Sequence, residues 1–168
     1  MILIAIGANL PNPVYGLPLA SCKAVLPELD KAGMAVSKVS RWYESAPVPA
    51  SSQPWYINGV AAVATSMNAH QVLASLLAIE AEFGRVRGQR NAARTLDLDL
   101  IAFNDLIIEE ETGDQSLILP HPRMHQRAFV LCPVFDVAPD WRHPQSGVSV
   151  QQMIDDLDNS HSASPLNE

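Results

Sequence analysis

The chain has 168 residues and a formal net charge of −7, so it is long enough for one domain with its own core and too acidic for broad electrostatic binding to nucleic acid. Its hydrophobic fraction of 48% and charged fraction of 17% are typical of a folded globular protein and exclude a disordered one. Two cysteines, Cys22 and Cys132, are too few for a disulfide framework or a zinc site, which favours a reducing compartment. The apolar run at residues 2–6 is too short for a signal peptide or a membrane span. We therefore predict a cytoplasmic protein that binds neither nucleic acid nor membranes.

Hydrophobic periodicity predicts strands and helices along residues 1–157, with no repeat and no linker that would divide them into two domains. The predicted elements are a strand at about 2–6, a helix at 16–31, strands at 34–44 and 55–66, a helix at 68–84, a strand at 95–103 and a helix that ends before Pro139. Asn68 is placed to cap the second helix and Gly84 to follow its end. Three prolines make residues 46–54 a loop.

Two further segments complete the predicted organisation. Residues 104–119 read as a small hairpin, and residues 158–168, rich in Ser and Asn, are expected to be a flexible C-terminal tail. The order β-α-β-β-α-β predicts an α+β fold of the ferredoxin-like, split βαβ type, an antiparallel sheet with helices packed on it. We expect these helices on one face, which leaves the opposite face free for loops and a site.

The stretch "RTLDLDLIAF" at 94–103 places two carboxylates on one side of a predicted strand. Side chains alternate along a strand, so Asp97 and Asp99 lie on the same face, about 7 Å apart. A hard cation such as Mg²⁺ relieves the repulsion within such a pair and fills its other positions with water and phosphate oxygens. Four arginines directly upstream suit a polyphosphate; they are Arg85, Arg87, Arg90 and Arg94. The alternative is that both carboxylates simply face water.

A second polar cluster lies in "PHPRMHQR" at 120–127. His121 and His125 have the i, i+4 spacing of a zinc pair, but Pro122 and the missing Glu make that interpretation poor. His121 and Arg127 fit better as phosphate ligands, whereas capping or surface roles remain open for His125 and Arg123. The chain has no G-x-x-x-x-G-K-[ST] motif, so any ATP must be held by arginines, metal and loop backbone.

Five motifs, in this order and spacing, resemble the 6-hydroxymethyl-7,8-dihydropterin pyrophosphokinase family over about residues 1–157. They are "AIGANL", "YESAPV", "QPWYINGV", "GRVR…RTLDLDLI" and "LPHPRMHQRAFVLCPVFDVAPDW". The resemblance implies a ferredoxin-like enzyme of folate biosynthesis that moves a pyrophosphoryl group from ATP to the pterin alcohol and leaves AMP. It also implies two Mg²⁺ ions on Asp97 and Asp99. We expect the enzyme to act as a monomer.

The resemblance assigns roles to individual residues of this chain. It implies catalytic roles for Arg85, Arg94, Asp97 and Asp99. It implies ATP or phosphate binding by Glu80, Arg87, Arg94, His121 and Arg127. It implies pterin binding by the side chains of Tyr56, Asn58 and Phe129 and by backbone groups of Ser45, Ala46 and Val48. Without the resemblance, Tyr56 and Phe129 read as core residues and Glu80 as a solvated helix residue. The proton acceptor stays open between Asp99 and a metal-bound water.

Alternatives and departures from the family pattern qualify these assignments. A ferredoxin-like RNA-binding module would need an aromatic-rich RNP signature and a basic surface, and the sequence has neither. A phosphotransferase with another acceptor stays open on the carboxylates and arginines alone; Tyr56, Asn58 and Phe129 favour a pterin. The loop before Arg94 lacks the Trp-Gly-Pro that family members often carry, which leaves loop closure and the role of Arg90 open.

Overall fold

The computed structural model describes residues 1–85, 93–109, 116–158 and 162–167. Predictions for Arg87, Arg90 and the rest of residues 86–92 therefore lie outside the described residues. The elements are β1 (Ile2–Ala8), α1 (Pro18–Lys31), β2 (Ala35–Val39), β3 (Tyr43–Ser45), β4 (Tyr56–Ala64), α2 (Ala69–Glu82), β5 (Asp97–Phe103), the 3₁₀ turn η1 (Met124–Gln126), α3 (Ala128–Val137), α4 (Val150–Asp155) and β6 (Ser164–Pro165).

The strands form one antiparallel sheet of six strands, in the order β5-β1-β4-β3-β6, with β2 also paired to β4. Neither helix connects neighbouring strands. β4 lies between β1 and β2, which α1 connects, and β1 lies between β4 and β5, which α2 connects. This arrangement is the split βαβ topology that the order of elements predicts, and the predicted α+β, ferredoxin-like fold is confirmed.

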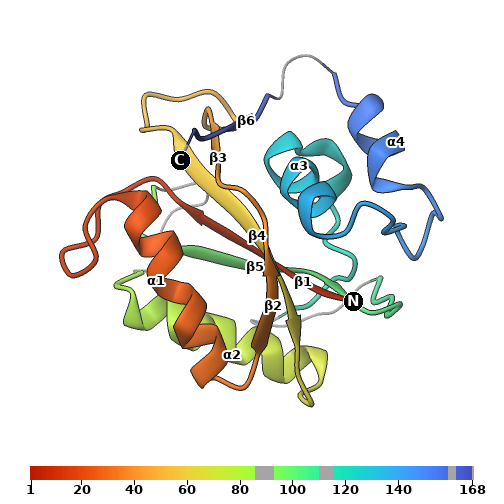
Figure 1. Cartoon of the computed structure of the whole chain (residues 1–168), viewed down its shortest axis with the longest axis horizontal. Helices are drawn as coiled ribbons and strands as arrows, with labels where there is room; N and C mark the ends of the chain where they lie inside the picture. Colours follow the sequence, from red (N-terminus) through yellow and green to blue (C-terminus); the bar gives the residue numbers. More distant parts are fainter. Residues whose placement is uncertain (86–92, 110–115, 159–161, 168) are drawn as a thin grey trace.

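Helices cover both faces of this sheet, as Figure 1 shows, with α1 and α2 on one side and α3 and α4 on the other. Ile4 and Ile6 of β1 pack with Leu76 of α2 in one core, while Leu3 packs with Leu131 of α3 in a second core. Alternation along β1 separates the two cores. The expectation that all helices share one face is wrong, because α3 covers part of the face expected to be free. The remainder of that face carries the cavity described below.

The predicted strand at 34–44 is interrupted, and its two halves pair with different parts of β4. At the interruption the Trp42 indole packs against Gly59, where an added Cβ would lie 2.6 Å from the ring. The Val60 N–H donates to the Ser40 hydroxyl at 2.9 Å, which replaces a ladder bond with a side-chain bond. A glycine on β4 thus admits the indole and divides the edge strand.

Helix boundaries follow local capping where a capping residue is present. The Asn68 side chain accepts from the Gln71 N–H, and the Gln71 side chain accepts from the Asn68 N–H, which completes a capping box for α2. The short helix α4 begins at Ser149, whose hydroxyl accepts from the Gln152 N–H, and it was not predicted. A six-residue helix offers too little periodicity to be recognised.

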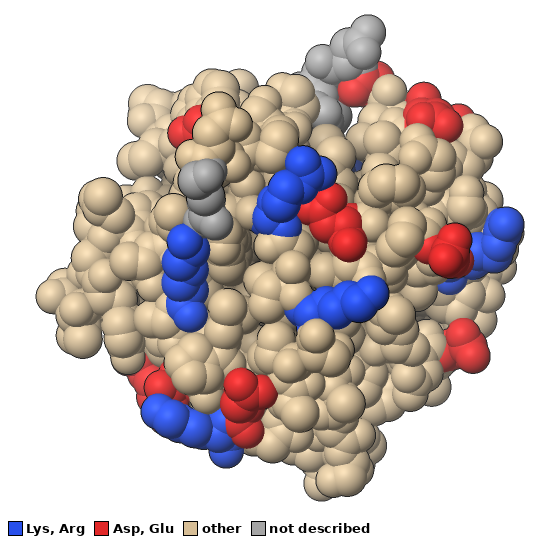
Figure 2. Space-filling model, in the orientation of Figure 1, with Lys and Arg blue, Asp and Glu red and all other residues tan. Residues whose placement is uncertain are grey.

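The expected C-terminal tail contains a short strand. β6 pairs with β3, and the Leu166 N–H donates to the Trp42 carbonyl at 2.8 Å. Among the described residues, no helix is long and apolar enough to cross a membrane. Figure 2 shows lysine, arginine and acidic side chains interspersed on one face of the molecule, without a continuous basic surface.

Candidate active site

The candidate site lies where small residues of the central strand β1 leave the sheet uncovered. Gly7 pairs with Asn58 of β4 on one side and with Asp97 of β5 on the other, and Ala5 pairs with Asp99. Paired residues point to the same face. The polar side chains of Asn58, Asp97 and Asp99 therefore lie on one face of the sheet, and the small residues Ala5 and Gly7 between them form the floor of the site. An added Cβ at Gly7 would lie 3.4 Å from the Asn58 side-chain oxygen. The sequence shows this floor only as the small residues in "IAIGA".

A cavity of about 320 Å³ stands on this floor. The predicted site residues that line it are Ser45, Ala46, Val48, Tyr56, Asn58, Arg85, Arg94, Asp97, Asp99, His121, Arg127 and Phe129. Segments from the first strand to the start of α3 therefore meet in one place. Gly7, Gln53 and Arg123 also line the cavity, and none of them is among the residues for which the resemblance implies a binding or catalytic role. Glu80 does not line it, and Arg87 lies outside the described residues.

Asp97 forms ion pairs with two arginines of the cavity, Arg85 and Arg94. The Arg85 guanidinium lies 2.6 Å from one of its carboxylate oxygens, and the Arg94 guanidinium is hydrogen-bonded to the other. Burial acts to lower the pKa of Arg94, but the charge of Asp97 and this hydrogen bond raise it overall. Both guanidinium groups are held at the cavity wall, where their unused N–H groups can bind an anion.

Asp99 lies beside this cluster, and within the described part of the chain it makes no ion pair. Burial raises its pKa to about 6, with the neighbouring Asp97 charge as the next cause, and Arg127 opposes both. A buried carboxylate without a directly bound cation is costly in its charged form. The chemistry of the carboxylate pair thus fits a divalent cation. The described residues contain no cluster of three or more His, Cys, Asp or Glu side chains arranged for a metal, so water or substrate oxygens would complete its shell.

Glu80, for which the resemblance implies ATP binding, is buried beneath β5 with a side chain that is 2% exposed, so the alternative of a solvated helix residue is wrong. Its carboxylate accepts the Leu98 N–H at 2.6 Å and pairs with the Arg85 guanidinium. Burial raises the pKa of Glu80 to about 7, against the opposing effects of Leu98 and Arg85. This position on the inner face of α2 ties β5 and Arg85 together.

The ends of the arginine-bearing segment 85–94 are fixed by the turn that ends α2. The Phe83 carbonyl accepts from the Asn12 side-chain amide at 2.7 Å and from the Thr95 hydroxyl at 3.0 Å. The Tyr15 ring stacks on the Phe83 ring with centroids 4.4 Å apart. The Thr95 hydroxyl thus ties the residue after Arg94 to the turn that precedes Arg85.

The segment before α3 adds an imidazole and a further guanidinium. Burial, together with Arg127 and Arg123, lowers the pKa of His121 to about 4, so its imidazole is neutral at pH 7. Its Nδ1 accepts from the Arg123 N–H at 3.2 Å, which leaves the proton on Nε2 as a donor. Arg127 lies over the Phe129 ring, 5.5 Å from its centroid.

The opposite end of the cavity carries neutral polar groups and aromatic rings. The Asn58 side-chain amide donates to the Ser45 hydroxyl at 2.9 Å and is 7% exposed. Tyr56 stands on the same face of β4, and Phe129 approaches from the first turn of α3. A fixed amide with aromatic rings nearby suits a flat heterocycle with hydrogen-bonding edges. The cavity thus has an anionic-ligand end and a heterocycle end.

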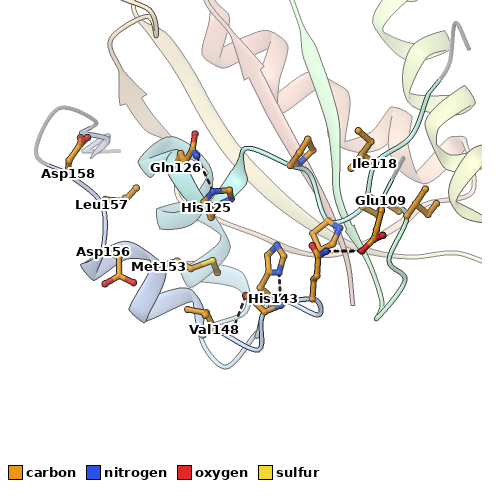
Figure 3. Close-up of a pocket in the computed structure, with 16 residues that line it drawn as sticks. Glu109, Ile118, His125, Gln126, His143, Val148, Met153, Asp156, Leu157 and Asp158 are labelled. Atoms are coloured by element: carbon orange, nitrogen blue, oxygen red, sulfur yellow. Dashed lines mark hydrogen bonds between the residues drawn. The ribbon is translucent and has the colours of Figure 1, made fainter. Parts of the chain in front are cut away.

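A second and larger cavity, of about 910 Å³, lies between η1, the turn before α4 and the pair formed by Ile108 and Leu119. Figure 3 shows His125, His143 and Glu109 around it, with Met153 and Leu157 contributed from α4 and its end. No arginine or lysine of the described residues lines this cavity. It lacks the charge convergence that distinguishes the smaller one.

Comparison with known proteins decides the family. Residues 3–139 match the family model described as 7,8-dihydro-6-hydroxymethylpterin-pyrophosphokinase. This chain belongs to that family. It is 38% identical to a 2-amino-4-hydroxy-6-hydroxymethyldihydropteridine pyrophosphokinase from Synechocystis over 156 residues, which cover 93% of this chain and 75% of that relative. It is 39% identical to the enzyme of the same name from Haemophilus influenzae, covering 86% of each.

Solved structures agree on the fold of this pyrophosphokinase. Plasmodium falciparum HPPK-DHPS, crystallised with STZ-DHP, superposes with a TM-score of 0.67 at 12% identity and covers 92% of this chain. The match spans 42% of the Plasmodium chain, so it concerns one part of a longer protein and supports the fold alone. The family and the named relatives establish the activity as pyrophosphate transfer to hydroxymethyldihydropterin in folate biosynthesis.

Proposed function

We propose that this pyrophosphokinase is a Mg²⁺-dependent enzyme. One end of its smaller cavity binds the phosphates of ATP, and the other end binds the pterin beside them. The observation that carries the proposal is the row Asn58–Gly7–Asp97 across three adjacent strands. Strands lie about 4.8 Å apart, so the backbones of Asn58 and Asp97 are about 10 Å apart on either side of Gly7. That spacing accommodates a bicyclic ring with its hydroxymethyl group directed toward the phosphates.

Asp97 and Asp99 would hold two Mg²⁺ ions together with phosphate oxygens. When bound, the metal neutralises phosphate charge and fixes the geometry of the polyphosphate. The support is the half-buried carboxylate pair, in which Asp99 makes no ion pair among the described residues. Arg85 and Arg94 already neutralise Asp97, and they remain close enough to the cavity to bind phosphate.

The chain's own residues then act on the phosphates by charge and position. Arg85, Arg94 and Arg127 stabilise charge on the phosphoryl oxygens, and the neutral His121 donates from Nε2. Arg87 is proposed for the same task from the segment outside the described residues. Glu80 acts on ATP through Arg85, which it holds against β5. Phosphoryl transfer depends mostly on such positioning and electrostatic stabilisation.

The pterin end orients the acceptor. Asn58 and the backbone of Ser45, Ala46 and Val48 would bind the ring edge, while Tyr56 and Phe129 contact its faces. The hydroxymethyl oxygen attacks the β-phosphorus, and the bond from this phosphorus to the oxygen shared with the α-phosphorus breaks. The products are AMP and the pterin diphosphate, with one proton released. One chain supplies both ends of the cavity in this proposal, and we propose that the monomer is the active unit.

Product analysis tests this reaction directly. The protein is mixed with ATP, Mg²⁺ and 6-hydroxymethyl-7,8-dihydropterin, and the nucleotides are separated. We expect AMP to form only when the pterin is present and to stop when the metal is chelated. ADP as the product would contradict attack at the β-phosphorus. No nucleotide product from folded protein, with varied metal, would contradict the proposed acceptor.

A further inference from the structure

Three segments that are far apart in the sequence meet at the buried side chain of Asn9, which is 1% exposed. Its amide nitrogen donates to the Gln53 side-chain oxygen and to the Pro54 carbonyl, each at 3.1 Å. Its side-chain oxygen accepts from the Arg94 N–H at 2.8 Å. The side chain therefore holds residues on either side of the cavity at the same time.

The backbone around Asn9 reinforces one side of this connection. The N–H groups of Asn9 and Leu10 both donate to the Arg94 carbonyl at 3.0 Å. The peptide groups of Arg94 are thus bonded through both their N–H and their C=O to the loop that follows β1. Arg94 in turn binds Asp97 at the phosphate end of the cavity. The position of Asn9 consequently fixes the Arg94 backbone, from which the side chain extends to Asp97.

The other side of the connection leads to the pterin end. The Gln53 side-chain oxygen also accepts from the Tyr56 hydroxyl at 3.3 Å, and both residues line the cavity. Pro54 closes the loop at 46–54 that carries the proposed backbone contacts to the pterin. A displacement of this loop is therefore transmitted to Asn9 through two hydrogen bonds.

We propose that Asn9 is a positioning residue that couples the two half-sites, so that a ligand at one end strengthens binding at the other. An amide is suited to this task because it accepts from Arg94 and donates to two oxygens of the opposite loop at once. A ligand that fixes Gln53 and Pro54 thereby favours the position of Arg94 that binds the other ligand. The inference rests on the proposed function, because it assigns the two ends of the cavity to pterin and nucleotide.

Asn9→Asp separates coupling from simple support. One oxygen of the new carboxylate can still accept from the Arg94 N–H. The other oxygen replaces the amide nitrogen and faces the Pro54 carbonyl, so that hydrogen bond is lost because neither oxygen can donate. Asn68→Asp is the matched control, because Asn68 is remote from the cavity, and an N-cap carboxylate accepts from the Gln71 N–H as the amide does. If the first variant does not fold, Gln53→Ala removes one of the two bonds from Asn9 to the opposite loop, together with the bond to the Tyr56 hydroxyl.

Calorimetry measures the pterin dissociation constant with and without a saturating, non-cleavable α,β-methylene analogue of ATP and Mg²⁺. The ratio of the two constants is the coupling factor. We expect a factor of about tenfold for the unmodified chain and for Asn68→Asp. In Asn9→Asp it should fall to within about twofold of unity, while each single-ligand constant changes less than about threefold.

Two results would overturn the coupling role. One is an unchanged factor in Asn9→Asp or, if that variant does not fold, in Gln53→Ala; the other is a factor near unity in the unmodified protein. An Asn9→Asp protein whose whole loss lies in the single-ligand constants would show a structural role instead. These failures leave the proposed function intact, because both ligands still bind. Absence of binding by the unmodified protein would instead contradict the proposed function, and this inference with it.

Discussion

The two cavities of this pyrophosphokinase differ in a way that volume does not reveal. The larger, about 910 Å³, is lined by apolar side chains with histidines and acids at its edge, whereas the smaller, about 320 Å³, brings arginines, paired carboxylates and aromatic rings together. The smaller one lies on the sheet, where strand pairing fixes each side chain to its neighbour. The larger one lies between turns and a six-residue helix. Converging charge around the carboxylate pair of β5, and not size, distinguishes the candidate site.

The largest effect is expected from the centre of the smaller cavity. Asp97→Asn removes the charge that holds Arg85 and Arg94 and one half of the proposed metal site, so kcat should fall on the order of 10³-fold. Pterin affinity measured by calorimetry should stay nearly constant, because Asn58 and Phe129 are untouched. Asp105→Asn, at an exposed turn after β5, is the matched control. A loss of pterin affinity with kcat retained would reverse the assignment of the two ends.

The heterocycle end gives the next largest effect. Phe129→Ala removes a proposed stacking surface worth about 1–3 kcal/mol, which corresponds to a pterin dissociation constant raised about 5- to 150-fold. Nucleotide binding in the presence of Mg²⁺ should change little. Phe135→Ala, on the same helix and packed in the α3 core, controls for lost helix packing. Equal loss of pterin affinity in both variants would contradict a contact by Phe129.

A smaller effect is expected on the pH dependence of stability. The folded-state pKa of His121 is about 4, below its usual 6.5, so the unfolded chain binds more protons between these values. The free energy of unfolding therefore falls as pH drops through 6.5 toward 4. Relative to His121→Asn, the unmodified chain should lose about 1–2 kcal/mol between pH 7 and pH 4.5, which allows for partial exposure. Urea denaturation at both pH values measures the difference; a constant difference would show that His121 is not buried as described.

The smallest effect is expected at the larger cavity. His143→Asn combined with Gln145→Ala alters two of its polar lining residues without touching the charged row on the sheet. We expect kcat/KM for the pterin to change by less than about twofold, as for ordinary surface substitutions. A tenfold loss in the steady-state assay would place part of substrate binding in this cavity and remove the contrast between the two.

Local chemistry made most of the fold predictable. Asn68 marked the start of α2 by its capping geometry, and alternation placed Asp97 and Asp99 on one face. The division of the strand at 34–44 was not predictable, because it depends on Trp42 packing against Gly59, a residue of another strand. The position of α3 on the second face escaped prediction for a similar reason, since an apolar helix pattern does not say which face it covers.

The candidate site divides in the same way. Motif spacing pointed to the residues that meet in the smaller cavity, but it did not show that Glu80 is buried under β5 as a partner of Arg85. That arrangement depends on the packing of α2 against β5, which has no local signal. The bonds of Asn9 to Gln53 and Arg94 are likewise contacts between loops. Roles carried by single side chains were visible in the sequence, whereas roles carried by connections between segments were not.

A crystal structure of the ternary complex tests the central claim most directly. The protein would be crystallised with Mg²⁺, α,β-methylene-ATP and 6-hydroxymethyl-7,8-dihydropterin. We predict metal bound to both Asp97 and Asp99, phosphates beside Arg85 and Arg94, and the pterin at Asn58 with its ring against Phe129. Nucleotide phosphates or pterin bound in the larger cavity, with the carboxylate pair free of metal, would contradict the account.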